Sequence, residues 1–567
     1  MMVTMHDDPT PQVLRGGTIV DGTGAPATRA DVLIAGGRVV EVGEGIATDA
    51  ATEIDVAGLV VAPGFIDVHT HYDAQVLWDP DLTPSSWHGV TTVVMGNCGF
   101  GIAPTRPQHR DLIAETLENV EGMSVDALKA GIRWEFQSFP QYLDVLDATP
   151  TRLNVAPMVG HTPVRLYVLG EEASTRAATS DEIGEMRRIV SEAMHAGAIG
   201  FASSKSIAHV GARGMPVPSR LASVDEIMQL VTAMRDVQHG ITQVTSGADL
   251  FLDEFATMAR ASGHPVSWTA LLTGFDGVSQ FTGPGAGPEV VERNAALDAD
   301  VWPQMTCRPL TMQLNLAEPY ALAGLPAFAE ILTMPRAERG RMYIDDGWRE
   351  RARPQVDGRY RHRWQKITVQ ESSRHRDLLG RSISELARER RRDPFDLLLE
   401  LSLDEGLATR YRIVIGNDDE TELAQLLRDP RVLLGLSDAG AHADQLCDAC
   451  APTYLLEHWV REAGVLSVEQ AVHRITGQPA RVFGFVDRGV VRKGAVADLV
   501  AFDPETVGPT DVERVRDLPG GAERLIVRSR GIEHVWVNGT AVRAHGQDLP
   551  DVRPGVLLRG GRGLGSR

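Results

Sequence analysis

The sequence predicts an α/β fold: a (β/α)₈ barrel of the TIM type with a small β-sandwich domain formed from both chain termini. Two observations lead to this fold class. Short apolar runs alternate with amphipathic helical patterns over residues 64–484, which is typical of parallel β/α units. Both chain ends are instead rich in short alternating strands that break at Gly-rich turns, as expected of antiparallel sheet.

The barrel strands are expected where apolar runs end in polar or small residues. They read TTVVMG, LNVAPMVG, AIGFASS, ITQVTSG, PVSWTALLTG, VWPQM and VLLGLSDAG. If these strands close a barrel, the residues at their C-terminal ends form the active face.

The two β-rich ends are each too small to bury a sheet face alone. We therefore expect residues 1–63 and 485–550 to form one composite β-domain. Residues 64–484 would form the barrel domain. The segment 551–567 is rich in Gly and Arg, and we expect it to be a flexible tail.

Residues 308–430 do not fit the even spacing of eight β/α units. The stretch is polar, Arg-rich and partly helical, with charge clusters at Arg336–Arg341 and Arg359–Arg363. We interpret it as an insertion between the last two barrel strands. It is either a solvated surface subdomain or a lid over the barrel mouth, since loops at that face commonly close active sites.

Composition excludes several classes of partner. The net charge of −20 argues against nucleic acid and against an anionic membrane, because an acidic surface repels both. No basic segment followed by an apolar stretch opens the chain, and no apolar run reaches about 18 residues, so neither a signal peptide nor a membrane span is predicted. Four cysteines give no disulfide framework and fit a reducing compartment. We expect a cytoplasmic protein with a small-molecule partner, and a homo-oligomer stays open.

The strongest chemical signal is GFIDVHTHYD at residues 64–73. The apolar run from Val60 to Ile66 predicts a buried strand. Because side chains two apart on a strand face the same side, His69 and His71 should project together. Two converging imidazoles are good ligands for zinc or a similar cation, so the sequence predicts a metal site at this strand end.

The segment APGFIDVHTHYD, preceded by a β-rich end, resembles the amidohydrolase superfamily, whose first barrel strand carries an H-x-H ligand pair. More narrowly, HGVTTVVM followed by Gly96-Asn97-Cys98-Gly99 resembles the D-aminoacylase branch, the N-acyl-D-amino-acid deacylases. LNVAPMVGHTPVR, AGAIGFASS and GLSDAGAH are similar to the third, fourth and eighth strands of that branch, and ADLVAFDPETV to its return to the β-domain. The resemblance covers essentially residues 12–545.

This resemblance implies roles for individual residues. Cys98 would be a metal ligand after the second strand. Asp438 would bind metal and handle the proton of the attacking water. His161 and Arg165 match the third-strand motif, and we expect Arg165, together with His442, to bind substrate. The implied cofactor is zinc, as one or two divalent ions.

The sequence departs from that branch at two strands. The branch places a ligand histidine at the end of strand five and another at the end of strand six, but GITQVTSGAD and HPVSWTALLTG end without one. His239 and His264 stand at the strand starts, on the far side of a barrel from the site. The lysine that follows the sixth-strand histidine, and helps hold the substrate carboxylate, is absent too. The complete metal site and the substrate specificity therefore cannot be carried over.

Other side chains could take the place of the missing ligands. Cys98 is either a thiolate ligand or a small buried hydrophobe. Lys205, just past the fourth strand, is either a carboxylated metal ligand or a charge at the pocket wall. His161 and His209 lie on loops at the expected active face and could bind metal, polarise a carbonyl or hydrogen-bond a loop. His442 could orient the catalytic aspartate or the substrate.

These residues predict hydrolysis of an amide C–N bond by metal-activated water. A cation on His69, His71 and Asp438 would lower the pKa of its bound water, and Asp438 would carry the proton to the leaving nitrogen. His161 or His209 would help to stabilise the oxyanion. The expected substrate is an N-acyl amino acid or a related small amide. Alternatives are a cyclic-amide hydrolase, a deaminase or an esterase of the same superfamily, and a catalytically inactive barrel that serves as a binding or scaffold protein.

Overall fold

The computed structural model describes residues 10–47, 51–247, 249–273, 278–279, 283–284, 287–319, 322, 324–360 and 363–563. The chain divides into two compact units. Unit 1 comprises Met1–Arg308, Asp419–Ala443 and Cys447–Arg567, and unit 2 comprises Pro309–Asp418 and Asp444–Leu446.

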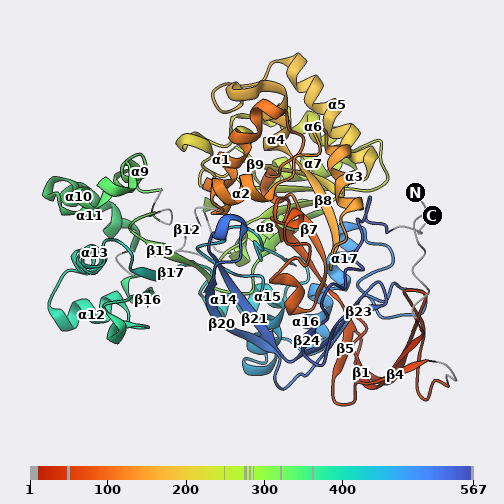
Figure 1. Ribbon diagram of the computed structural model, residues 1–567. Coiled ribbons are helices and arrows are strands. Elements are labelled where there is room, and N and C mark those ends of the chain that lie inside the picture. The colour runs from red at the N-terminus through yellow and green to blue at the C-terminus, as the bar shows by residue number, and fades with distance from the viewer. Residues whose placement is uncertain are drawn as a thin grey trace. The chain divides into compact units, whose positions relative to one another are not determined.

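Unit 1 contains a barrel of eight parallel strands within the described part of the chain (Figure 1). In chain order they are β6 (Phe65–Thr70), β7 (Val90–Met95), β8 (Asn154–Gly160), β9 (Gly200–Ser204), β10 (Ile241–Thr245), β11 (Val266–Thr269), β14 (Val301–Met305) and β18 (Leu433–Leu434). Each strand pairs in parallel with the next. The ring closes where Thr70 bridges Ala439 and the N–H of His71 donates to the Ala439 carbonyl, 2.7 Å away. The predicted (β/α)₈ barrel is confirmed.

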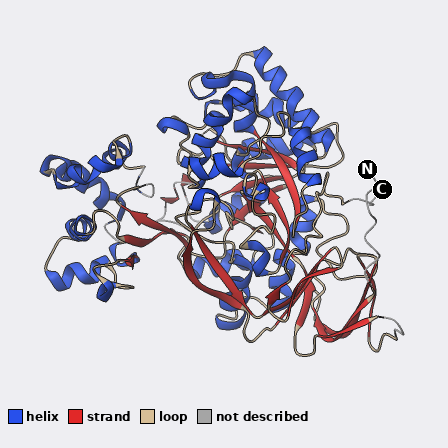
Figure 2. Ribbon diagram, viewed as in Figure 1, coloured by secondary structure: helices blue, strands red, loops and turns tan. Residues whose placement is uncertain are grey.

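Helices enclose the barrel strands (Figure 2). They are α1 (Arg110–Glu121), α2 (Val125–Gly131), α3 (Phe139–Ala148), α4 (His161–Leu169), α5 (Ser180–Ala196), α6 (Val224–Thr232), α7 (Leu252–Ser262), α8 (Gly287–Ala295), α14 (Glu420–Arg428), α15 (Ala451–Tyr454), α16 (Val468–Ile475) and α17 (Gly477–Phe483). Helix α5 shows how local sequence sets their ends. Thr179 and Glu182 form a capping box at its start, and Gly197 ends it with a φ of 110°. In the described residues, no helix is both long and apolar enough to cross a membrane.

The C-terminal segment packs against the barrel at the end where the strands begin. Leu558 is fully buried in the same apolar cluster as the inward-facing residues of β6, β7 and β8, and its N–H donates to the Val155 carbonyl, 2.8 Å away. The expectation of a flexible tail over 551–567 is therefore wrong for residues 551–563, because apolar burial holds this stretch against the strand starts. Residues 564–567 lie outside the described part.

Strands from both chain ends pair in one sheet, as predicted. Its order is β24-β23-β22-β19-β5-β1-β2-β3, with β4 beside β1. The strands are β1 (Gln12–Ile19), β2 (Thr28–Ala35), β3 (Arg38–Gly43), β4 (Thr52–Asp55), β5 (Val60–Pro63), β19 (Leu499–Phe502), β22 (Ile532–Val537), β23 (Thr540–Ala544) and β24 (Gln547–Asp548). The antiparallel pair β5–β19 joins the two ends, seen as red and blue strands in Figure 1. A separate hairpin comprises β20 (Gly508–Val515) and β21 (Arg524–Arg530).

Unit 2 has a core of its own. Its antiparallel sheet comprises β15 (Leu310–Asn315), β17 (Arg410–Gly416) and β16 (Ile367–Glu371), and its helices are α9 (Pro326–Leu332), α10 (Arg336–Ile344), α11 (Asp346–Tyr360), α12 (Ile383–Arg390) and α13 (Pro394–Asp404). Buried Trp348 packs edge-on against Phe328 with ring centroids 5.3 Å apart. The unit lies in the chain between β14 and β18, where we expected an insertion. A lid role stays a prediction.

Candidate metal centre

Two histidines come from the end of β6. His69 is fully buried and His71 is 6% exposed, although both are polar. Nδ1 of His69 lies 3.0 Å from Oε1 of Gln304, and the Gln304 amide in turn donates to Ser267 Oγ at 2.7 Å. An amide oxygen only accepts, so Nδ1 of His69 carries the proton and Nε2 is left to bind a cation.

Cys98 follows β7 in a short turn. Its φ of 56° lies in the left-handed region, which a side chain with a Cβ rarely occupies. The backbone N–H of Cys98 donates to Oε1 of Gln243 at 2.6 Å, which holds this conformation. Its Sγ lies 3.4 Å from Nε2 of His69. The strained turn thus directs the thiol toward the histidine pair.

The ligand atoms of His69, His71 and Cys98 all lie within 4.8 Å of one another. Asp438, which follows β18, adds a fourth donor. Its Oδ1 lies 3.3 Å from Nε2 of His69 and 3.9 Å from Nε2 of His71, and its side chain is 20% exposed. Two imidazole nitrogens, one sulfur and one carboxylate oxygen are a donor set that suits a divalent zinc-like cation. The residues present therefore fit a metal ion.

Electrostatics at this cluster favour a thiolate ligand. Burial raises the pKa of Cys98, but the neighbouring charge of His69 and hydrogen bonds from the two imidazoles bring it down to about 7. Burial lowers the pKa of His71, yet the Glu121 charge and the contact with Cys98 outweigh this effect and raise it well above its usual range. A thiol with a lowered pKa is the kind that binds metal.

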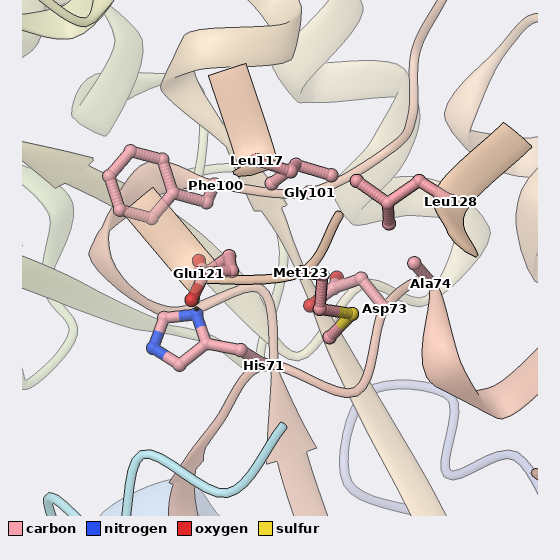
Figure 3. Close-up of a pocket in the computed structure, with 9 residues that line it drawn as sticks. All are labelled: His71, Asp73, Ala74, Phe100, Gly101, Leu117, Glu121, Met123 and Leu128. Carbon is pink, nitrogen blue, oxygen red and sulfur yellow. Dashed lines mark ion pairs between the residues drawn. The ribbon is translucent and has the colours of Figure 1, made fainter. Parts of the chain in front are cut away.

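Two partners of the histidines were missed in the sequence. Glu121, the last residue of α1, places Oε1 3.0 Å from Nδ1 of His71, and Figure 3 shows the pair. Nothing near Glu121 in the sequence indicates this contact. Gln304 carried a weak signal, because it is a polar residue inside the apolar strand VWPQM.

Strands β10 and β11 end without histidines, as the sequence indicated. Thr245 and Thr269 stand at these ends, and the Thr269 hydroxyl donates to that of Thr245 at 3.2 Å. The Gln243 amide donates to Thr269 Oγ1 at 3.3 Å. Neutral side chains that are hydrogen-bonded to one another therefore occupy the ends of β10 and β11, where we expected the ligand histidines of the D-aminoacylase branch to be missing.

Lys205 is not brought to the metal cluster, which corrects its assignment as a ligand. Its Nζ donates to the carbonyls of Arg220 at 3.0 Å and Ala222 at 2.7 Å, and it forms an ion pair with Asp249 at 3.1 Å. Three acceptors around one nitrogen suit an ammonium group, whereas a carboxylated lysine has one N–H to donate.

His161 and Arg165 belong to a buried network rather than to an open pocket. Nε2 of His161 lies 2.9 Å from Oε1 of Glu226, and Nδ1 lies 2.9 Å from Ser203 Oγ. Both carboxylate oxygens of Glu226 accept from Arg165, which is fully buried. These contacts occupy both ring nitrogens of His161 and hold the guanidinium of Arg165 inside the network, so the assignments of His161 to catalysis and of Arg165 to substrate binding are corrected.

His209 lies near the cluster, and His442 is close enough to His209 to influence its pKa. Nδ1 of His209 is 2.6 Å from Ser204 Oγ, and its ring centroid is 5.0 Å from that of Phe100, whose ring is 6.3 Å from His71. Burial, followed by the charges of His442 and His71, lowers the pKa of His209 to about 3. The half-buried imidazole is therefore neutral at neutral pH.

A parallel barrel with nitrogen, sulfur and carboxylate donors at its strand ends defines a class of hydrolases that act at the barrel mouth. A model of the amidohydrolase family matches residues 52–543, and the chain belongs to this family. The expectation of a hydrolase acting on non-peptide carbon–nitrogen bonds is confirmed at this level.

The chain is similar over nearly its whole length to the relatives that follow. It is 30% identical to a D-aminoacylase of Alcaligenes xylosoxydans xylosoxydans, over 95% of this chain and 96% of the relative. A solved D-aminoacylase, described by its binuclear metal centre with one-metal activation and second-metal attenuation, has a TM-score of 0.65 at 27% identity, covering 97% of this chain and 99% of that one. The N-acyl-D-glutamate deacylase of Bordetella bronchiseptica, complexed with zinc and a phosphonate inhibitor, gives the same values.

Proposed function

We propose that this protein is a one-metal N-acyl-D-amino-acid deacylase. The observation that carries the proposal is the convergence of His69, His71, Cys98 and Asp438 at one strand-end cluster. The relatives named as D-aminoacylase and D-amino-acid deacylases support this substrate class. The threonines at the ends of β10 and β11 favour one metal ion over two, and zinc is the first candidate.

The residues divide the chemistry among them. When bound, the metal supplies Lewis acidity, which activates water and polarises the amide carbonyl. Asp438 accepts the proton of the attacking water and passes it to the amide nitrogen as the C–N bond breaks, so that a carboxylic acid and an amine leave. Ser204 Oγ lies 2.6 Å from Nδ1 of His209, and with the hydroxyl as donor Nε2 would carry an N–H to stabilise the developing oxyanion.

Arg220 supplies a charge for the substrate carboxylate. Its Nη1 donates to the His209 carbonyl at 3.1 Å, which ties the guanidinium to the loop after β9. Burial lowers the pKa of Arg220, and no carboxylate forms an ion pair with it among the described residues. A half-buried guanidinium without an acidic partner is suited to bind a carboxylate. Arg220 would replace the lysine that the branch uses.

The direct test is amine release by the full-length, zinc-loaded protein. The panel contains N-acetyl-D- and N-acetyl-L-amino acids, hydantoins, dihydropyrimidines and simple esters. The proposal expects turnover of N-acetyl-D-amino acids and its loss after chelation. Turnover of the cyclic amides alone would contradict the proposal and would indicate a cyclic-amide hydrolase. No turnover on any panel member by protein that holds zinc would favour a binding or scaffold role.

A further inference from the structure

A small cavity borders His71, one of the histidines of the metal cluster (Figure 3). It measures about 10 Å³, on the order of one water molecule. His71, Asp73 and Glu121 supply its polar lining, and the rest of the lining is Ala74, Phe100, Gly101, Leu117, Met123 and Leu128. Figure 3 shows that the His71 ring and the Glu121 carboxylate face each other at its edge.

Glu121 occupies a place that is unfavourable for a carboxylate. The residue is 4% exposed and ends helix α1, where the helix dipole repels negative charge. Among the described residues, no lysine or arginine forms an ion pair with it, and its charged-group contact is His71. The contact with His71 is therefore the interaction that accounts for a carboxylate at this place.

The contact with His71 supplies the reason. Oε1 of Glu121 and Nδ1 of His71 are 3.0 Å apart, and neither atom has another hydrogen-bond partner. A carboxylate only accepts, so it keeps the imidazole proton on Nδ1 and leaves Nε2 to face Asp438. The geometry matches that of Gln304 and His69, with a charged acceptor in place of a neutral one.

Glu121 also contacts the segment after β18, which carries Asp438. Its backbone carbonyl accepts from the N–H of Ala443 at 3.1 Å, five residues after Asp438. One residue of α1 thus fixes the ring of His71 and anchors the segment that carries Asp438.

We infer that Glu121 is a positioning residue of the metal centre: its carboxylate orients His71 and raises the affinity of the site for a divalent cation. This inference rests on the proposed metal function.

The test measures zinc affinity of the full-length protein by competition with a chromophoric chelator, together with the unfolding of the metal-free protein in urea. Glu121→Gln keeps an acceptor but removes the charge, and Glu121→Ala removes both. We expect affinity to fall in the order wild type, glutamine variant, alanine variant, with a total loss of about 10- to 100-fold. The urea titration checks that each metal-free variant is folded, so that a loss of affinity reports on the metal site.

Glu115→Gln is the matched control, since Glu115 lies on the same helix and pairs with Arg213 at the surface. It should leave zinc affinity unchanged. Cobalt absorption spectra give a second readout, because a displaced His71 alters the ligand field. Wild-type affinity and spectra in both Glu121 variants would overturn the inference. A wild type that binds no zinc would instead overturn the proposed function.

Discussion

The side-chain oxygen of Gln304 lies 3.0 Å from Nδ1 of His69, and the amide nitrogen of Gln304 donates to Ser267. The second contact fixes which way the amide points. The first contact then fixes the tautomer of the imidazole, so that Nε2 faces Cys98 and Asp438.

Gln304→Leu should weaken metal binding while the barrel stays folded. Leucine is of similar size, but it offers no acceptor to Nδ1 of His69, so the ring loses its fixed tautomer. We expect zinc affinity to fall by about 10- to 100-fold in a chelator competition titration. Ser267→Ala, which removes only the orienting hydroxyl, should cause a smaller loss. Equal zinc affinities in the wild type and the two variants would show that Gln304 does not orient His69.

Asp438→Asn should fold and retain much of its metal through the other three donors, but it should lose turnover. The amide cannot take the proton from water or return it to the leaving nitrogen. Removal of a general acid–base group typically lowers the rate by about 10²- to 10⁴-fold. Steady-state kinetics on any amide that the wild type hydrolyses, with metal content measured alongside, test this expectation. Near-normal turnover in the variant would mean that Asp438 only caps its loop.

How far the sequence alone predicted this site depends on the range of the contacts. Side-chain alternation on a strand led to His69 and His71, and the resemblance to the D-aminoacylase branch led to Cys98 and Asp438. The partner of His161 is Glu226, which lies 65 residues away along the chain, so no local pattern predicts the contact. The partners of Lys205 include the backbone carbonyl of Arg220, and a carbonyl leaves no trace in a sequence pattern. The packing of residues 551–563 was not predicted, because the high Gly and Arg content of this segment indicated a flexible tail although it contains the buried Leu557 and Leu558.

Arg220→Met should impair substrates that carry a carboxylate. Loss of a charge-assisted hydrogen bond of about 1.5–3 kcal/mol corresponds to roughly 10- to 100-fold in kcat/KM. The same variant should hydrolyse an N-alkyl acetamide that lacks the carboxylate as fast as the wild type does. Arg213→Met changes an exposed arginine nearby in the same segment and serves as the control. A parallel loss on both kinds of substrate would show that Arg220 supports the loop instead.

Buried His88 should make stability depend on pH. Its Nδ1 lies 2.8 Å from Thr453 Oγ1 and its Nε2 lies 2.9 Å from the Val527 carbonyl, and burial lowers its pKa to about 4 from 6.5. Between these values the unfolded chain binds a proton that the native protein does not. The stabilisation is therefore complete above about pH 6.5 and is lost as the pH falls toward 4, by on the order of 3 kcal/mol. Urea unfolding of His88→Gln should show a shallower pH dependence in this window, and identical slopes would contradict a neutral buried His88.

The most direct test of the central claim is the metal content of the full-length protein purified without chelator. Elemental analysis should find about one divalent ion per chain, with zinc first among the candidates. The variant His69→Ala/His71→Ala should be folded by circular dichroism and hold none. A wild type without metal, or a double variant with undiminished content, would contradict the assignment of the metal centre to this strand end.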